Sequence, residues 1–273
     1  MQRKEAAVAK HSIIFGPIQS RRLGSSLGLD LLPGKICSFD CVYCECGRTV
    51  TLTSERSEYI SAEKIIAELD AYLKNNPPKI DVITLGGSGE PLLNSGIGKV
   101  ISHIKKSYPQ FKIAVLTNSV SLTDKEIHGE ISPADFVLPS VDAFFEESYQ
   151  KINRPTKNLS VDSVLSGLRD FSRSYKGIIW VEYFVISGIN DSDGEIIALK
   201  NYFSEIKPTK IQINSLDRPG TCAWVKPVEI SRLLEIKNAM LPLEVEIISR
   251  NHSGKINDGR AATGKFLSEE EEK

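Results

Sequence analysis

The chain has 273 residues, of which 41% are hydrophobic and 25% charged, and its formal net charge is −1. This composition is typical of a globular protein with one large α/β domain or two small ones, and the near-zero charge excludes a general attraction to nucleic acid or anionic membrane. Because the most apolar stretch, residues 178–189, is interrupted by Glu182 and is too short to span a bilayer, we expect no membrane association.

Predicted strands and helices alternate along most of the chain. We expect strands over residues 27–32, 81–85, 111–116, 136–138, 178–186, 210–213 and 245–248. We expect helices after the capping residues Ser61, Thr123 and Ser192, and over 97–107, 144–151, 160–173 and 227–240. Six βα units in series predict a partial (β/α)6 TIM-like barrel with parallel strands over residues 27–250, and a doubly wound sheet is the alternative. Residues 1–26 would form an N-terminal extension, and 251–273 a C-terminal extension with a disordered acidic tail.

Three of the five cysteines lie within eight residues, as Cys37-x3-Cys41-x2-Cys44, with Tyr43 directly before the last. Thiolates this close can converge on one metal centre only if the chain wraps around it as a loop. They are one ligand short of a closed zinc site or of a fully ligated four-iron cluster. A structural zinc site with a distant fourth ligand and ordinary buried cysteines are the alternatives. The sparse, clustered cysteines and the lack of a visible signal peptide favour a reducing cytoplasm.

Polar residues follow the predicted strands at the ends where ligands bind in parallel βα folds. The cysteine loop follows the first strand. After the next five strands come Glu90, Asn118, Asp142, the segment 188–190 and Asn214. A single Asn or Asp after a strand is most often a turn residue or a helix cap. Six such positions on one rim, with a metal loop among them, instead favour a shared binding pocket.

These motifs resemble those of the radical SAM superfamily. The cysteine spacing, with its aromatic residue, is similar to the cluster loop of that family, and the segment 87–91 (GSGEP) is similar to its motif for the amino group of S-adenosylmethionine. Ser140-Val-Asp142 resembles its ribose region, and residues 186–191 resemble its adenine region. The resemblance implies one 4Fe-4S cluster on Cys37, Cys41 and Cys44. It also implies S-adenosylmethionine bound by Gly87, Ser88, Gly89, Glu90, Asn118, Ser140, Asp142, Gly188 and Asn214.

The same resemblance implies an enzyme that cleaves S-adenosylmethionine reductively to a 5′-deoxyadenosyl radical, which then abstracts hydrogen from a substrate. An electron donor such as flavodoxin or ferredoxin would be its partner. A narrower resemblance, in residues 15–28, 44–49 and 152–155, is to a group of little-characterised iron–sulfur oxidoreductases classed near tRNA 4-demethylwyosine synthases. The substrate could be a tRNA base, a peptide or a small molecule. A peptide- or protein-modifying enzyme and a non-catalytic metal-binding module remain alternatives.

Two cysteines lie outside the three-ligand motif, Cys46 and Cys222. An auxiliary cluster generally needs at least three more thiolates, so we expect a single cluster. Cys222 follows the sixth predicted strand in a stretch rich in proline and glycine, which places it on the substrate rim. It is either a small apolar filler or a catalytic thiol near the substrate.

Overall fold

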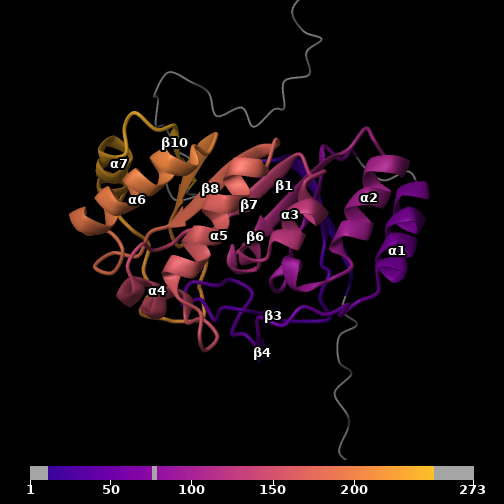
Figure 1. The fold of residues 1–273 in the computed structure, drawn as a ribbon, viewed down its shortest axis with the longest axis horizontal. Coiled ribbons are helices and arrows are strands. Elements are labelled where there is room, and N and C mark those ends of the chain that lie inside the picture. Colours follow the sequence, from indigo (N-terminus) through magenta and orange to yellow (C-terminus); the bar gives the residue numbers. More distant parts are fainter. Residues whose placement is uncertain (1–11, 76–78, 249–273) are drawn as a thin grey trace, which may run out of the picture.

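An eight-stranded sheet forms the centre of the molecule (Figure 1). The computed structural model describes residues 12–75 and 79–248, so the predicted acidic tail lies outside the described residues. In sheet order the strands are β1 (Ile14–Ser20), β2 (Gly24–Leu29), β5 (Val82–Leu85), β6 (Lys112–Thr117), β7 (Phe136–Pro139), β8 (Ile178–Phe184), β9 (Lys210–Asn214) and β10 (Val245–Ile248). Every neighbouring pair is parallel except β1 and β2, which form an antiparallel hairpin. The predicted α/β fold with a mainly parallel sheet is confirmed.

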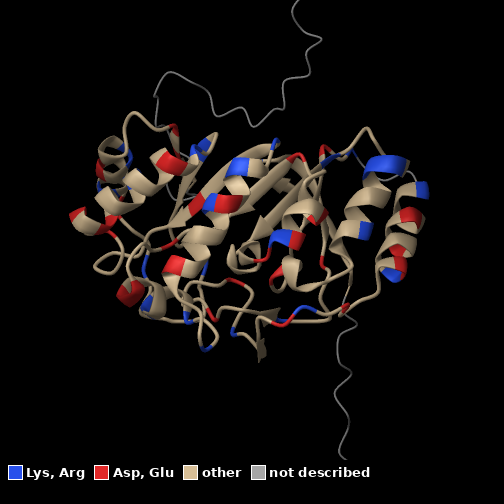
Figure 2. Cartoon of the chain, viewed as in Figure 1, with Lys and Arg blue, Asp and Glu red and all other residues tan. Residues whose placement is uncertain are grey.

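Helices follow the strands and pack on the sheet (Figure 1). They are α1 (Ala62–Lys74), α2 (Ile97–Ser107), α3 (Lys125–Ile131), α4 (Glu146–Asn153), α5 (Val161–Ser174), α6 (Asp193–Ile206) and α7 (Ile230–Ala239), with short 3-10 turns η1 (Pro91–Leu93) and η2 (Val120–Thr123). In α5, Val164, Leu168 and Phe171 recur on one buried face, and the Ser160 side chain caps the first turn. Charges of both signs are interspersed over the outward faces of the helices (Figure 2). None of the helices in the described ranges is long and apolar enough to cross a membrane.

The side chains of each strand alternate between the two faces of the sheet. Ile83 and Leu85 of β5 join the large core beneath the helices, whereas Val82 joins a smaller apolar cluster on the opposite face. That smaller cluster also contains Leu23, Ala114, Phe136 and Leu138. Apart from Ile152 of α4, which packs against Val42 in a third cluster, the buried apolar residues of the helices gather in the large core. This one-sided arrangement does not fit a doubly wound sheet, which needs helices on both faces.

A two-stranded parallel ribbon carries the start of the cysteine loop. It pairs β3 (Ile36–Cys37) with β4 (Thr51–Leu52) and lies at the lower edge of the molecule in Figure 1. Glu90 N, which follows β5, donates to Ile36 O at 3.1 Å, so the ribbon is attached at the carboxyl end of a central strand. The fold therefore places the cysteines at the end of the sheet where ligands bind in parallel βα folds.

The hairpin strand β1 was not among the predicted strands. It contains Gly16 and Pro17, residue types that are depleted in strands. Because β1 pairs only with β2, one side of its backbone needs no partner, and an edge strand of this kind tolerates proline. The hairpin also shifts the first parallel strand, which begins at Gly24 and ends at Leu29 rather than spanning residues 27–32.

Candidate metal centre

The cysteine loop is held in place by backbone hydrogen bonds from two distant parts of the chain. Val42 N donates to Ile152 O at 2.9 Å, near the end of α4. Cys222 N, in the segment after β9, donates to Val42 O at 3.1 Å. Within the loop, Cys44 N donates to Cys41 O at 3.2 Å, which closes a turn between the second and third motif cysteines. Tertiary contacts thus fix a loop that has little regular secondary structure of its own.

Each of the three motif cysteines accepts a hydrogen bond from a nitrogen-bearing side chain. The contacts are Lys35 Nζ to Cys44 Sγ at 2.9 Å, Asn118 Nδ2 to Cys37 Sγ at 3.5 Å, and Asn153 Nδ2 to Cys41 Sγ at 3.5 Å. The three donors come from different segments: the loop before β3, the residue after β6, and the last residue of α4. Hydrogen bonds to the ligand sulfurs are one of the means by which proteins tune iron–sulfur clusters.

The three thiols differ in their electrostatic surroundings. Burial raises the pKa of Cys37 to about 11, and burial also raises the pKa of Cys41. By contrast, a hydrogen bond with the Cys46 thiol and the nearby Lys35 ammonium lower the pKa of Cys44 to about 5. The pKa of Cys44 thus lies below those of the other two motif cysteines. Because metal ligands must be deprotonated, binding has to displace protons from the other two thiols.

The donor set fits a cluster with one open iron better than a mononuclear site. All three motif cysteines are free thiols. A structural zinc site needs four ligands at about 2.0 to 2.3 Å from one ion, whereas the motif supplies three. Three thiolates on one loop, each with an N–H donor, instead leave one coordination position of a four-iron cluster to an external ligand.

Glu90 is buried where the end of β5 meets the end of β6. Its carboxylate accepts hydrogen bonds from Asn118 N at 2.7 Å, from Thr117 Oγ1 at 2.8 Å and from Leu92 N at 3.1 Å. Burial raises the pKa of Glu90 to about 7. The side chain therefore ties two strand ends together, and it is the backbone of this segment that remains for a ligand.

The two glycines before Glu90 allow the chain to approach its neighbours closely. A Cβ atom on Gly89 would lie 1.9 Å from Ile36 O, and one on Gly87 would lie 2.4 Å from the Asp30 side chain. Ser88, between them, donates its backbone N–H to Asp30 Oδ2 at 2.8 Å. Close packing against β3 and the end of β2 thus explains why this segment needs glycine, before any ligand is considered.

Asp142 lies beside the cysteine loop, but its carboxylate is occupied by protein donors. It accepts hydrogen bonds from Tyr43 OH at 2.6 Å, from Asn153 Nδ2 at 2.7 Å and from Phe184 N at 3.1 Å. The Tyr43 ring stacks on the Phe184 ring, with the centroids 3.9 Å apart and the planes at 8°. From its position after a strand, Asp142 was predicted to lie near the cofactor. Its observed contacts make it a brace for Tyr43 and α4, and its ribose role stays a prediction.

The remaining residues of the predicted site lie along the same rim. Asn118 and Ser140 follow β6 and β7 directly, and Asn214 is the last residue of β9. Gly188 lies in the turn after β8 with a φ of 75°, and its N–H donates to Asp191 Oδ1 at 2.7 Å. The hydrogen bond within the turn and the positive φ explain why position 188 is a glycine. Its role in binding the adenine stays a prediction.

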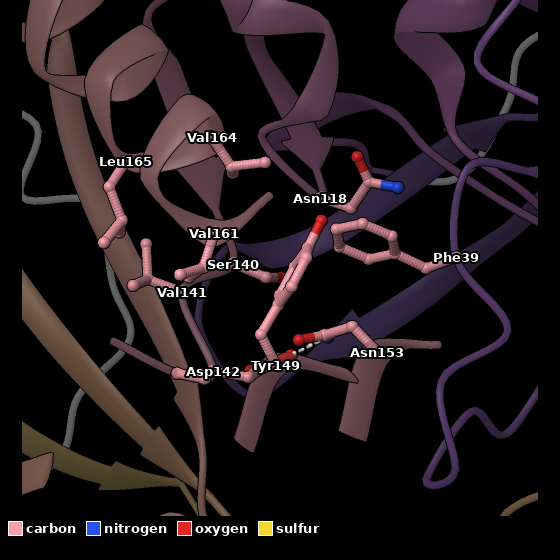
Figure 3. A pocket seen from close by; sticks show the side chains of 11 residues that line it. Phe39, Asn118, Ser140, Val141, Asp142, Tyr149, Asn153, Val161, Val164 and Leu165 are labelled. Carbon is pink, nitrogen blue, oxygen red and sulfur yellow. Dashed lines mark hydrogen bonds between the residues drawn. The ribbon is translucent and has the colours of Figure 1, made fainter. Parts of the chain in front are cut away.

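A small cavity lies beside Phe39 of the cysteine loop (Figure 3). Its volume is about 10 Å³, and its lining includes Phe39, Asn118, Ser140, Asp142, Tyr149 and Asn153. The Tyr149 hydroxyl is buried without a hydrogen-bond partner among the described residues, and Figure 3 shows it pointing toward Asn118. A space of this size holds one water molecule. It is far too small for a nucleoside, so we do not expect the cofactor there.

Cys222 and Cys46 both lie next to the loop. Cys222 Sγ accepts a hydrogen bond from Arg154 Nη2 at 3.2 Å. A Cβ atom on Gly220 would lie 2.6 Å from the backbone of Tyr43, so the segment after β9 packs directly on the outside of the loop. Cys46 is exposed, and its thiol donates to Gly87 O at 3.5 Å. The catalytic role expected for Cys222 stays a prediction.

Lys35 and Asn153 were not among the predicted site residues. Asn153 is 112 residues away from Cys41, and their contact depends on how α4 packs on the loop, so no local pattern could indicate it. Lys35 is only two residues before Cys37. That closeness was the one available signal, but a single lysine beside a turn is usually a solvated surface residue.

Comparison with known proteins gives consistent matches. The model of the radical SAM superfamily matches residues 31–199. A UPF0026 protein of Methanocaldococcus jannaschii is 35% identical over 241 residues, which is 88% of this chain and 73% of that protein. A protein of Brachyspira hyodysenteriae named GTPase Obg is 33% identical over 259 residues, 94% of this chain, but the chain spans only 38% of its length.

Among solved structures, a radical SAM methyltransferase from Sphaerobacter thermophilus is similar with a TM-score of 0.65 and 15% sequence identity. The similarity covers 82% of this chain and 66% of that protein. At this level of identity it bears on the fold alone.

Proposed function

The chain belongs to the radical SAM superfamily, and from that premise we propose that it cleaves S-adenosylmethionine reductively at a single 4Fe-4S cluster held by Cys37, Cys41 and Cys44. The observation that carries the proposal is the set of three free thiols on one loop, each with a side-chain N–H donor from a different segment. When bound, the reduced cluster supplies the electron that splits the sulfonium into methionine and a 5′-deoxyadenosyl radical, which removes hydrogen from the substrate.

The residues of the chain itself bind and orient the cofactor in this proposal. Backbone carbonyls of the segment 87–90 accept hydrogen bonds from the ammonium group, while the Glu90 side chain keeps the ends of β5 and β6 together. Ser140 lies on the ribose side. Asp142 acts there by orienting Tyr43, because its carboxylate already accepts the Tyr43 hydroxyl. The turn after β8, at Gly188, and the end of β9, at Asn214, would face the adenine in this proposal.

Anaerobic reconstitution tests the proposal. The chain is loaded with iron and sulfide, reduced with dithionite and incubated with S-adenosylmethionine, and 5′-deoxyadenosine is measured. We expect a brown protein with about four irons per chain that produces 5′-deoxyadenosine. Replacing Cys37, Cys41 or Cys44 by Ala should each remove most of the iron and all of the cleavage, because two thiolates cannot hold the cluster. A colourless protein that binds zinc instead would contradict the proposal.

For the substrate we propose a tRNA base, presented to the outer side of the cysteine loop. Two arginines there have exposed side chains, Arg48 at 74% and Arg218 at 55%, and ion pairs with Asp40 and Glu45 attach them to the loop. Trp224, in the segment that packs on the loop, is 51% exposed. Arginine contacts to phosphate and bases stacked on aromatic rings are the usual means of recognising single-stranded RNA.

Binding of total tRNA, measured at several salt concentrations, tests this choice of substrate. Affinity should fall steeply as salt rises, because arginine–phosphate contacts release counterions. Trp224→Ala should weaken binding without changing the salt slope, whereas Arg218→Ala should reduce the slope. Binding that is absent or insensitive to salt would instead favour a peptide or a small molecule. A one-electron donor such as flavodoxin or ferredoxin is the protein partner that the proposed reaction requires.

A further inference from the structure

Lys35 is positioned at the cysteine loop by its own backbone. Its carbonyl accepts hydrogen bonds from Val50 N at 3.0 Å and Thr51 N at 3.1 Å, which attach it to the strand β4. One residue later begins β3, the strand that carries Cys37. The lysine is therefore anchored on the ribbon from which the loop starts.

The ammonium group of Lys35 is directed at sulfur. Nζ lies 2.9 Å from Cys44 Sγ. The side chain is partly buried, so solvent screens its charge less than it would screen a fully exposed lysine. A full positive charge thus stands beside one ligand of the proposed cluster.

The contacts to the other two sulfurs are of a different kind. Asn118 and Asn153 donate to Cys37 and Cys41 from neutral amides, both at 3.5 Å. A charge-assisted hydrogen bond is roughly twice as strong as a neutral one. Of the three donors, Lys35 should therefore have the largest effect on the free-energy difference between the oxidised cluster and the cluster reduced by one electron.

We propose that Lys35 raises the reduction potential of the cluster by stabilising its reduced state through Cys44. The inference rests on the proposed function, because it needs a cluster on the three cysteines. Reduction adds one negative charge to the cluster and its thiolates, and a nearby cation stabilises the more negative state. The potential of an iron–sulfur cluster depends on such charges and on hydrogen bonds to its sulfurs. Lys35 is in these terms a positioning residue for the electron transfer, not a ligand.

The experiment compares the reconstituted chain with Lys35→Met, Lys35→Gln and Lys35→Arg. Iron content is measured first, and the midpoint potential is then determined by a redox titration followed by EPR, without S-adenosylmethionine. Lys35→Met should keep about four irons per chain. Its midpoint potential should be lower by about 59 mV or more, which for one electron means that the ratio of reduced to oxidised cluster at a fixed potential falls about tenfold or more. Lys35→Arg should restore most of the wild-type value because it keeps the charge. Lys99→Met, an exposed lysine on α2, is the control and should titrate like the wild type.

Each outcome decides the inference. If Lys35→Met loses iron, Lys35→Gln takes its place in the test, because glutamine keeps a hydrogen-bond donor but has no charge. The cluster of Lys35→Gln should then show the lowered potential. A full cluster in Lys35→Met with the wild-type potential overturns the proposal. Loss of iron in both Met and Gln variants, with retention in Lys35→Arg, also overturns it and makes Lys35 an assembly residue. Failure of the proposed function would look different, because the wild-type chain itself would then bind no cluster.

Discussion

Replacing Gly89 by Ala should displace the strand that carries the first cysteine ligand. The added Cβ would lie 1.9 Å from Ile36 O, a backbone atom that cannot rotate away, and restoring a separation of 3.0 Å requires a backbone shift of about 1 Å. Overpacking of this kind costs about 1 to 3 kcal/mol, a large part of the roughly 5 to 15 kcal/mol that stabilises a typical domain. Because Ile36 directly precedes Cys37, the shift should also misplace the ligand sulfur.

Two measurements check this prediction. Urea unfolding of the metal-free Gly89→Ala chain should give a free energy of unfolding about 2 kcal/mol below wild type, and reconstitution should give clearly less iron. The matched control is Gly34→Ala, in the segment between β2 and β3, where an added Cβ meets nothing within 4 Å. The control should keep both the stability and the iron content of the wild type. The reasoning is refuted if Gly89→Ala binds iron and unfolds like the control.

Three further changes test the contacts around the loop. Tyr43→Phe removes the 2.6 Å hydrogen bond to the buried Asp142 carboxylate, so urea unfolding should show a loss of about 2 kcal/mol; no loss would mean that the other donors to Asp142 compensate. Burial raises the pKa of Glu90 from 4.5 to about 7, so the folded chain holds this proton more tightly than the unfolded chain. Its contribution to stability is therefore greatest below about pH 4.5 and falls as the pH rises to about 7, and Glu90→Gln should flatten that slope in a pH series of urea unfolding. Cys46→Ala should retain the iron of the wild type after reconstitution, and a loss would make Cys46 a ligand.

The alternation of strands and helices could be predicted because it rests on local patterns. All four residues of β5 are buried, which matches a short apolar run between turn signals. The hairpin strand β1 could not be predicted in this way. Its stability comes from pairing with β2 and from the Phe15 ring, which packs over Gly28 so closely that a Cβ there would lie 2.1 Å away. Such pairing is a tertiary property, and Gly16 and Pro17 conceal it in the sequence.

The grouping of the candidate ligand cysteines could be predicted, but their surroundings could not, and their role as ligands stays a prediction. Three cysteines within eight residues form a local signal that needs no knowledge of the fold. Asp142, by contrast, was predicted to face a ligand because it follows a strand. Its actual partners, Tyr43 and Asn153, are 99 and 11 residues away, and their side chains reach it only after the loop and α4 have packed together. The position of a polar residue on a rim can thus be foreseen, whereas its hydrogen-bond partners depend on the packing.

The segment after β9 packs on the candidate metal centre, although the superfamily match, which ends at residue 199, does not include it. Thr221 Oγ1 lies 2.9 Å from Cys41 O and 3.0 Å from Val42 O, and Cys222 N donates to the same Val42 carbonyl. These two carbonyls lie between the second and third motif cysteines, and a buried carbonyl must find a donor. The conformation of the loop therefore depends on residues 180 positions later in the chain. Thr221 and Cys222, which lie beyond the family match, thus cover the cysteine loop from outside. We expect the features that select the substrate to lie in this segment after β9.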